Sequence, residues 1–210
     1  MVTTTQSEEQ WLELRRTRFT ASQIHKLMGT PRNKSEYLSE TAKTFIYEKG
    51  AEILTNQRNE IYGRALDWGK EHEKQAYEAF DPFNSLATYY GGETFVFIEY
   101  GDFGGYSPDA LGDDFIVEIK CPFNSGIHLR NFSIKTNEDL KSQHSEYYWQ
   151  VQMGMIASAC ENAFFVSYDP RMPDSHKKHV VNITLDDVKD LIDEKLYYAG
   201  HMLRNVIELQ

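Results

Sequence analysis

Residues Gly104–Phe123 read "GGYSPDALGDDFIVEIKCPF", a proline–aspartate pair and an acidic turn followed by a strongly β-prone run. Side chains alternate between the two faces of a strand. Glu118 and Lys120 therefore project to one side, while Val117 and Ile119 project to the other side, toward a core. The stretch predicts a strand that carries charge on one face.

The acidic turn predicts a hairpin between residues 103–111 and 114–121. Such a hairpin brings Asp109 close to Glu118 across the strand pair. An isolated Glu-x-Lys pair is more often part of a solvated sheet face. With Asp109 beside it, the pair becomes a cluster of two carboxylates and one ammonium group.

This cluster has the composition of a metal-dependent hydrolytic site. Adjacent carboxylates raise each other's pKa unless a cation lies between them, and their hard oxygens suit Mg²⁺ or Mn²⁺ better than Zn²⁺. A metal held in this way binds a phosphate oxygen and activates a water molecule. Lys120 then holds or deprotonates that water and stabilises negative charge in the transition state. These residues together predict phosphodiester hydrolysis.

The whole chain sets wider limits. Its 210 residues fit one domain, 1–210, without a membrane-spanning apolar run or a signal-peptide pattern, which predicts an intracellular protein. Two cysteines are too few for a disulfide framework. The net charge of −10 is unusual for a DNA-binding protein, although basic residues gather at 15–18, 31–34 and 176–179.

The order of predicted elements favours a mixed α/β (α+β) fold, with a central mixed five-stranded sheet flanked by helices. Residues 122–137 are expected to be mostly irregular. Helices are predicted at about 8–16, 20–29 (capped by Thr20 or Ser22), 35–49, 65–80, 139–158 and 186–208, and strands at 93–100, 103–111, 114–121, 163–169 and 177–185.

Two helical residues extend the candidate site. Glu73 shares a helix face with Gly69 and would supply a third carboxylate; the alternative is that it belongs to a solvated charged face. Gln150 would orient water or phosphate; the alternative is a hydrogen-bonded interior glutamine.

Six segments resemble one family in their order and spacing. They are "WLELRRTRFTAS", "ALDWGKEHE", "YSPDAL", "VEIKCPF", "WQVQMGM" and "YDPRM", between Trp11 and about Met172. The chain is thereby similar to the phage lambda-type exonucleases, or YqaJ-like viral recombinase nucleases, of the PD-(D/E)xK superfamily. This resemblance implies a restriction-endonuclease-like core.

The resemblance also implies roles for the candidate residues. Asp109, Glu118 and Glu73 would bind Mg²⁺, or Mn²⁺ in its place, with two ions expected in each site. Lys120 would be the catalytic lysine, and Gln150 would assist the site.

Further positions of the family bind DNA. Arg15, Ser22 and Ser107 would hold a terminal 5′-phosphate, since an arginine fork with hydroxyl donors suits a phosphate. Leu66 would be an apolar wedge that parts the terminal base pair, and Arg32 would touch the DNA ahead of it. The alternatives are a core position for Leu66 and a solvated loop position for Arg32.

One position departs from the family pattern. An arginine that completes the phosphate pocket is replaced by Gly126 in "KCPFNSG". His128 and Arg130 are the nearby candidates to replace it. The dependence on a 5′-phosphate is therefore open.

The activity that the resemblance implies is 5′-to-3′ digestion of double-stranded DNA from its ends. Mononucleotides would be released, and 3′ single strands would be left for recombination. A ring-shaped homotrimer, a single-strand annealing partner and a phage or prophage origin in a bacterial cytoplasm are implied with it.

Three alternative activities compete with this one. An endonuclease of restriction or repair type would use the same cluster and cut closed circles. A catalytically silent DNA-end-binding module would share the fold, although the intact cluster argues against it. A zinc hydrolase is disfavoured because the histidines show no HExxH spacing.

Overall fold

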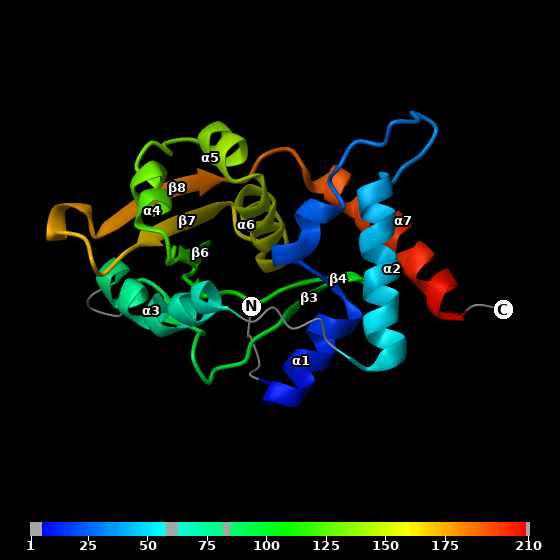
Figure 1. Cartoon of the computed structure of the whole chain (residues 1–210), viewed down its shortest axis with the longest axis horizontal. Coiled ribbons are helices and arrows are strands. Elements are labelled where there is room, and N and C mark those ends of the chain that lie inside the picture. The colour runs from blue at the N-terminus through cyan, green and yellow to red at the C-terminus, as the bar shows by residue number, and fades with distance from the viewer. Residues whose placement is uncertain (1–5, 58–62, 82–84, 209–210) are drawn as a thin grey trace.

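Strand β6 (Phe115–Lys120) occupies the middle of a five-stranded sheet in the computed structural model of the chain, which describes residues 6–57, 63–81 and 85–208 (Figure 1). The strand order is β2 (Thr88–Tyr89), β5 (Ala110–Leu111), β6, β7 (Asn162–Tyr168) and β8 (Lys178–Thr184). Strands β6 and β7 are parallel, and the other neighbours are antiparallel. The predicted central, mixed, five-stranded sheet is confirmed.

A second, three-stranded sheet has the order β1 (Phe19–Thr20), β4 (Gly104–Tyr106) and β3 (Ile98–Tyr100). The prediction of one strand over 103–111 is therefore wrong. The segment divides into β4 and β5, which belong to different sheets, and Pro108 lies between them, where a residue without an N–H interrupts the ladder. The predicted strand at 93–100 is shortened to β3, and the unpredicted β2 replaces it in the central sheet.

The hairpin between β5 and β6 has the expected register. Ala110 pairs with Val117 and Leu111 with Ile116, and the Gly112 N–H donates to the Phe115 carbonyl at 2.9 Å. Since the strands are antiparallel, the residue before Ala110 lies near the residue after Val117. Asp109 therefore reaches the Glu118 position from the point where the chain crosses between the two sheets.

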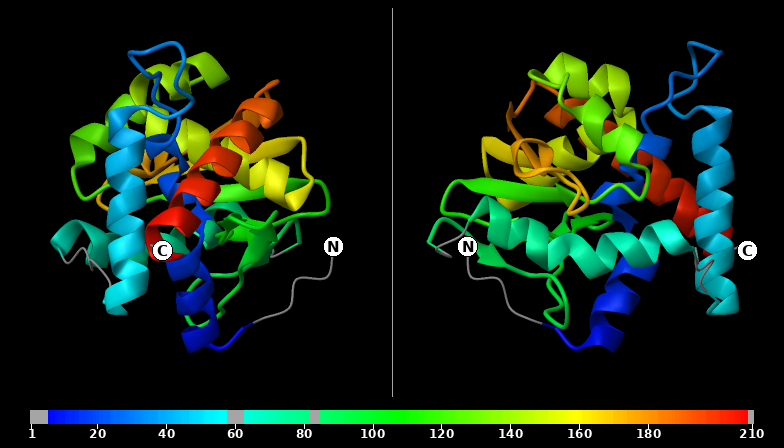
Figure 2. Two further views of the ribbon diagram at one scale, coloured as in Figure 1. Left: turned by 90° about the vertical axis from the view of Figure 1, so that its right-hand side faces the viewer. Right: turned by 60° about the vertical axis from the view of Figure 1, so that its left-hand side comes forward.

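Helices cover both faces of the central sheet. The Val117 and Ile119 face of β6 packs on Ala76 and Tyr77 of α3, and Ile116 belongs to the larger cluster that contains Met155 of α6. Figure 2 shows α2 and α7 lying side by side beyond the sheet. The α-helices are α1 (Glu8–Thr17), α2 (Glu40–Thr55), α3 (Arg64–Phe80), α4 (Ser125–Asn131), α5 (Asn137–Gln143), α6 (Ser145–Ser158) and α7 (Lys189–Glu208). Among the described helices, none has both the length and the apolar composition needed to cross a membrane.

Several predicted helix limits are corrected by local capping. The hydroxyl of Ser39 accepts from the Ala42 N–H at 3.2 Å, so α2 begins at Glu40 and not at 35. The predicted helix at 139–158 is two helices, because the backbone of His144 leaves the helical region between α5 and α6. Segment 122–137 is not wholly irregular, since α4 lies within it.

The predicted helix at 20–29 is also wrong. Residues 19–20 form β1 beside β4, and only a 3₁₀ helix, η1 (Ala21–Lys26), follows. Thr20 precedes η1, but its side chain makes no capping hydrogen bond. Tertiary pairing with β4 thus overrides the helical composition of this segment.

One buried histidine, His179, and one partly buried histidine, His25, predict a loss of stability in acid. Burial lowers the pKa of His179, and nearby Lys135 and His128 lower it further from its ordinary value of 6.5; burial likewise lowers the pKa of His25. Because the folded state favours the neutral rings, we expect the contribution of these histidines to the free energy of unfolding to be constant just above pH 6.5 and to fall below it. The raised pKa of Asp109 and of Glu73 contributes in the opposite direction, so a comparison with a histidine variant is needed to isolate this contribution. Urea titrations at pH 7.5, 6.5 and 5.5 measure this slope.

The matched variant for this prediction is His179→Gln. Its side-chain amide can still donate to the Ile134 carbonyl, which lies 3.0 Å from His179 Nε2. We expect a shallower loss of stability between pH 6.5 and 5.5 in this variant. An unchanged slope would assign the pH dependence to other groups.

Candidate active site

Glu118, Lys120 and Gln150 form a closed triangle of hydrogen bonds. Lys120 Nζ lies 2.6 Å from Glu118 Oε1 and donates to Gln150 Oε1 at 3.3 Å, and Gln150 Nε2 donates to Glu118 Oε1 at 2.5 Å. Strand β6 supplies the two charged groups, and α6 supplies the amide. Glu118 is only 1% exposed, whereas the Lys120 side chain is 20% exposed, so the carboxylate is removed from water and the ammonium group keeps partial access to it.

Asp109 is fixed at the entrance to β5. Its Oδ2 accepts a hydrogen bond from the Ile119 N–H at 2.7 Å, and its backbone carbonyl accepts from the Tyr90 N–H at 2.8 Å. Both contacts hold the carboxylate next to the middle of β6. The proximity of Asp109 and Glu118 expected from the hairpin is therefore present.

Glu73 approaches the same place from α3. Tyr89 of β2 donates to Glu73 Oε1 at 3.0 Å. A Cβ atom added to Gly91 would lie only 2.3 Å from that oxygen, so a glycine is required for the carboxylate to lie where it does. Nothing lies within 4 Å of a Cβ placed on Gly69, the glycine on the same helix face, so this position is open. The third carboxylate thus depends on Gly91 and Tyr89 for its position.

The carboxylates affect one another electrostatically. Burial raises the pKa of Asp109 well above its ordinary value, and repulsion by Glu118 and Glu73 raises it further. Burial also raises the pKa of Glu73; the Tyr89 hydrogen bond opposes this, and Glu118 adds to it. Burial acts against the charged form of Lys120, but Glu118 and Asp109 hold its pKa above the ordinary value. Three carboxyl groups thus share one lysine, and burial and their mutual repulsion favour the neutral forms of Asp109 and Glu73.

The chemistry of these donors fits a hard divalent cation, because carboxylate oxygens that repel one another are the ligands Mg²⁺ and Mn²⁺ prefer. Their present arrangement is one of side chains bonded to each other: within the described residues, no three histidine, cysteine, aspartate or glutamate side chains already form a group that could hold a metal ion. Metal binding would therefore require the carboxylates to exchange some of these hydrogen bonds for the ion.

Three tyrosines complete the surroundings and were not predicted. Tyr106 donates to Glu118 Oε2 at 3.5 Å, Tyr89 holds Glu73, and Lys120 Nζ lies 4.9 Å from the centre of the Tyr147 ring. The spacing of Tyr147 one helical turn before Gln150 was a usable signal. No pattern in the sequence distinguishes Tyr89, since its strand is only two residues long.

Two of the three predicted phosphate-binding residues are in contact. Arg15 Nη1 donates to Ser107 Oγ at 2.9 Å, and Trp11 Nε1 donates to the same oxygen at 3.0 Å. Ser22 Oγ lies 3.1 Å from Thr20 Oγ1. Strands β1 and β4 are parallel, with Thr20 opposite Gly105. Ser22 and Ser107 each follow two residues later, so they lie beyond the same end of the two strands. Ser107 and Asp109 therefore connect this group to the carboxylates.

Three of the remaining predicted positions are exposed, and one is buried. Leu66 is 45% exposed in the first turn of α3, which excludes the core alternative, and Arg32 is an exposed loop residue. His128 is fully buried, with Nδ1 2.8 Å from Ser167 Oγ and Nε2 2.7 Å from the His176 carbonyl. His128 is therefore not available to replace the arginine missing at Gly126, whereas Arg130 is exposed on α4.

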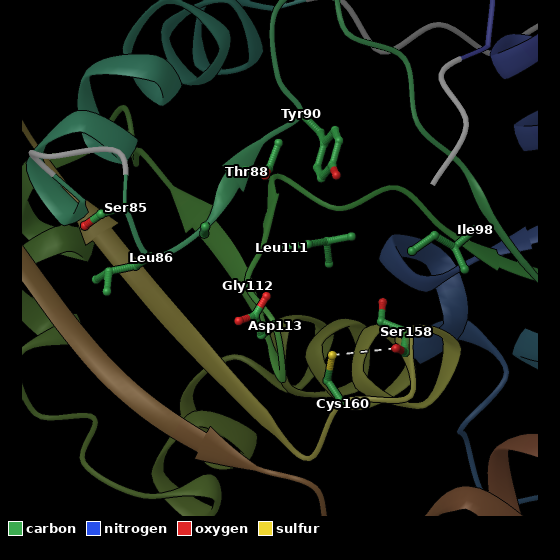
Figure 3. A pocket seen from close by; sticks show the side chains of 11 residues that line it. Ser85, Leu86, Thr88, Tyr90, Ile98, Leu111, Gly112, Asp113, Ser158 and Cys160 are labelled. Atoms are coloured by element: carbon green, nitrogen blue, oxygen red, sulfur yellow. Dashed lines mark hydrogen bonds between the residues drawn. The ribbon is translucent and has the colours of Figure 1, made fainter. Parts of the chain in front are cut away.

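A pocket of about 310 Å³ is lined by residues other than those of this cluster, and Figure 3 shows its lining. Side chains of β2, β5 and the end of α6 line it, among them Thr88, Leu111 and Ser158. None of the carboxylates, Lys120 or Gln150 lines it. The candidate active site is therefore the hydrogen-bonded cluster and not this pocket.

Comparison with known proteins places the chain among viral recombination proteins. A model of the YqaJ-like viral recombinase domain matches residues 10–161. An alkaline exonuclease from Laribacter hongkongensis, LHK-Exo, superposes with a TM-score of 0.75 at 26% identity, over 96% of this chain and 95% of that chain. LHK-Exo in complex with dAMP gives a TM-score of 0.74 at 26% identity, over the same shares of both chains. No curated protein sequence matches the chain.

A third solved structure supports the fold alone. The phage related exonuclease from Haemophilus somnus 129PT superposes with a TM-score of 0.77 at 18% identity, over 94% of this chain and 98% of that chain. These exonuclease structures share the mixed α/β architecture with its five-stranded sheet. The PD-(D/E)xK fold class predicted from the sequence is confirmed.

Proposed function

Because the chain belongs to the YqaJ-like viral recombinase domain family, we propose that it is a metal-dependent exonuclease that digests double-stranded DNA from the 5′ end. The observation that carries this proposal is the Glu118–Lys120–Gln150 triangle with Asp109 beside it. Burying several acids around one lysine costs free energy, and stability alone does not require this arrangement. The likeness to an alkaline exonuclease at 26% identity supports DNA as the substrate.

The residues divide the chemistry among them. Asp109, Glu118 and Glu73 would hold Mg²⁺ or Mn²⁺, with two ions in each site, and the metal would polarise the phosphate and lower the pKa of the attacking water. Lys120 would hold the attacking water and support negative charge on the phosphate oxygens. Gln150 holds the Lys120 ammonium group and the Glu118 carboxylate in position through its two hydrogen bonds.

Arg15, Ser107 and Ser22 would receive the phosphate at the 5′ end. An arginine fork and two hydroxyl groups can donate several hydrogen bonds to one phosphate. Leu66, exposed on α3, would part the terminal base pair, and Arg32 would contact the duplex ahead of it. The products would be 5′-mononucleotides and 3′ single-stranded tails.

The wider setting follows the family. A homotrimer would enclose the duplex, a single-strand annealing protein would coat the tail, and both would act in the cytoplasm of the bacterial host. With a net charge of −10, the subunits would have to turn basic side chains toward the DNA. Sedimentation of the purified protein measures its oligomeric state and so tests the homotrimer.

The proposed activity predicts a clear result on three DNAs. With Mg²⁺, we expect linear duplex with 5′-phosphates to be converted to mononucleotides and 3′ single strands, and covalently closed circles to remain intact. Linear duplex with 5′-hydroxyls tests whether Gly126 has relaxed the phosphate requirement. Cleaved circles would indicate an endonuclease, and DNA that is bound but uncut in every sample would indicate a silent module.

The Arg15→Ala variant tests the phosphate position. Losing a charge-assisted hydrogen bond to phosphate should raise KM for 5′-phosphorylated ends by about tenfold, with little change for 5′-hydroxyl ends. Initial rates on both substrates measure this. The control is Arg16→Ala, since Arg16 is paired with Glu13 and the Ile53 carbonyl. Equal losses on both substrates would remove Arg15 from phosphate binding.

A further inference from the structure

Arg171 joins three segments that surround the candidate active site. The first contact is with Asp169, which directly follows β7 and is fully buried. Arg171 Nε lies 2.8 Å from Asp169 Oδ1, and Nη2 lies 2.8 Å from Oδ2, so the pair is a two-point fork. Burial opposes the charged carboxylate, but the hydrogen bonds from Arg171 and Ser125 hold the pKa of Asp169 down at about 2. The pair therefore stays charged at neutral pH.

The second contact is with the turn that follows the catalytic strand. Arg171 Nη2 also donates to the Phe123 carbonyl at 2.9 Å and lies 3.4 Å from the Pro122 carbonyl. This turn begins at Cys121, immediately after Lys120. The guanidinium group thus ties the exit of β6 to the exit of its parallel neighbour β7.

The third contact is with α3. The Arg171 guanidinium carbon lies 4.2 Å from the centre of the Trp68 ring, and the Phe123 ring meets the same indole at 5.9 Å between centroids. The Trp68 indole also stacks on the His72 ring, with 3.8 Å between the ring centroids. His72 precedes Glu73 in the helix. Arg171 therefore contacts, through Trp68, the helix that presents Glu73.

We propose that Arg171 is a positioning residue that sets the distance between Glu73 on α3 and the Glu118–Lys120 pair on β6. This role rests on the proposed function. The Arg171 side chain is 40% exposed, so its removal opens no buried cavity. Its three contacts, however, belong to the three segments whose ends carry or adjoin the site.

The test uses Arg171→Ala, Arg171→Lys and Asp169→Asn. Each should weaken Mn²⁺ binding, measured by calorimetry, by about tenfold, and lower kcat by about ten- to hundredfold with KM for DNA ends within about twofold. Lysine should not rescue alanine, because it lacks the planar fork and its stacking on indole. In addition, amide hydrogen exchange of residues 64–80 should be faster than in the unchanged protein, while exchange in α7 stays the same.

A double-mutant cycle separates positioning from a general structural role. If Arg171 acts through Glu73, Arg171→Ala should change the rate by less than about twofold in a Glu73→Gln background. The control is Arg204→Ala. Arg204 lies over the Phe103 ring at 4.5 Å and pairs with Asp102 at 3.5 Å on the α7 side of the molecule, and its loss should leave cleavage and Mn²⁺ affinity unchanged.

The outcomes distinguish the two proposals. Unchanged Mn²⁺ affinity and unchanged exchange in α3 would overturn the role of Arg171, as would a full effect of Arg171→Ala without the Glu73 carboxylate. If the unchanged protein cleaves none of the three DNAs, the proposed function fails instead. Exchange and Mn²⁺ affinity still decide on Arg171 in that case.

Discussion

Lys120→Ala should lower the rate of DNA cleavage by about 10³-fold or more, since the ammonium group both orients water and stabilises charge in the transition state. The variant should also melt at a lower temperature. Removing the Lys120 ammonium group leaves Glu118, which is only 1% exposed, without the cation that lies 2.6 Å from its carboxylate. Initial rates on 5′-phosphorylated duplex and thermal unfolding measure the two effects.

A second variant separates chemistry from folding. Lys120→Gln keeps a hydrogen-bond donor for Glu118 and should recover most of the melting temperature without recovering cleavage. The matched control is Lys141→Ala, whose ammonium group lies 4.8 Å from the Tyr148 ring but outside the carboxylate cluster. Cleavage by Lys120→Gln at the unchanged protein's rate would remove Lys120 from the mechanism.

Asp109→Asn should abolish metal-dependent cleavage without a cost in stability. Losing one carboxylate ligand should weaken Mn²⁺ binding and lower the cleavage rate by about 100-fold or more. The asparagine oxygen can still accept from the Ile119 N–H. Because the pKa of Asp109 is raised, the folded state favours a neutral group there, so the metal-free variant should melt at the same or a higher temperature.

Two measurements check this opposite behaviour. Calorimetric Mn²⁺ titrations of the Asp109→Asn variant and the unchanged protein compare metal affinity, and thermal unfolding in EDTA compares metal-free stability. EDTA should also stop cleavage by the unchanged protein, and Mg²⁺ should restore it. A variant that melts at a much lower temperature in EDTA would show that Asp109 is a structural anion and not a metal ligand.

Local sequence patterns were sufficient for the core of the site. The two-residue period of β6 placed Glu118 and Lys120 on one face, and the acidic turn gave the hairpin that brings Asp109 to them. Helical composition placed Glu73 on α3, and Gln150 on a helix that reaches β6. Each of these elements follows from residues close together in the chain, where periodicity and turn chemistry are informative.

The parts that were missed depend on distant pairing. Strand β1 forms only because residues 19–20 lie beside Gly104 and Gly105, so helical composition gave the wrong element. Likewise, the two residues of β2 have no pattern of their own, although they carry Tyr89 to Glu73. Arg171 was visible in "YDPRM" only as part of a resemblance, since its contacts with Trp68 and Phe123 join residues far apart in sequence.

The segment that crosses between the two sheets fixes the distance between the Arg15–Ser107 contact and the carboxylate of Asp109. Ser107 leaves the small sheet in contact with Arg15, and Asp109 enters the central sheet beside β6. Only Pro108 separates Ser107 from Asp109, and two residue steps span at most about 7 Å of extended chain. On the proposed function, this fixed spacing sets how far the bond that breaks lies from the end that is held, and so sets the length of each released fragment.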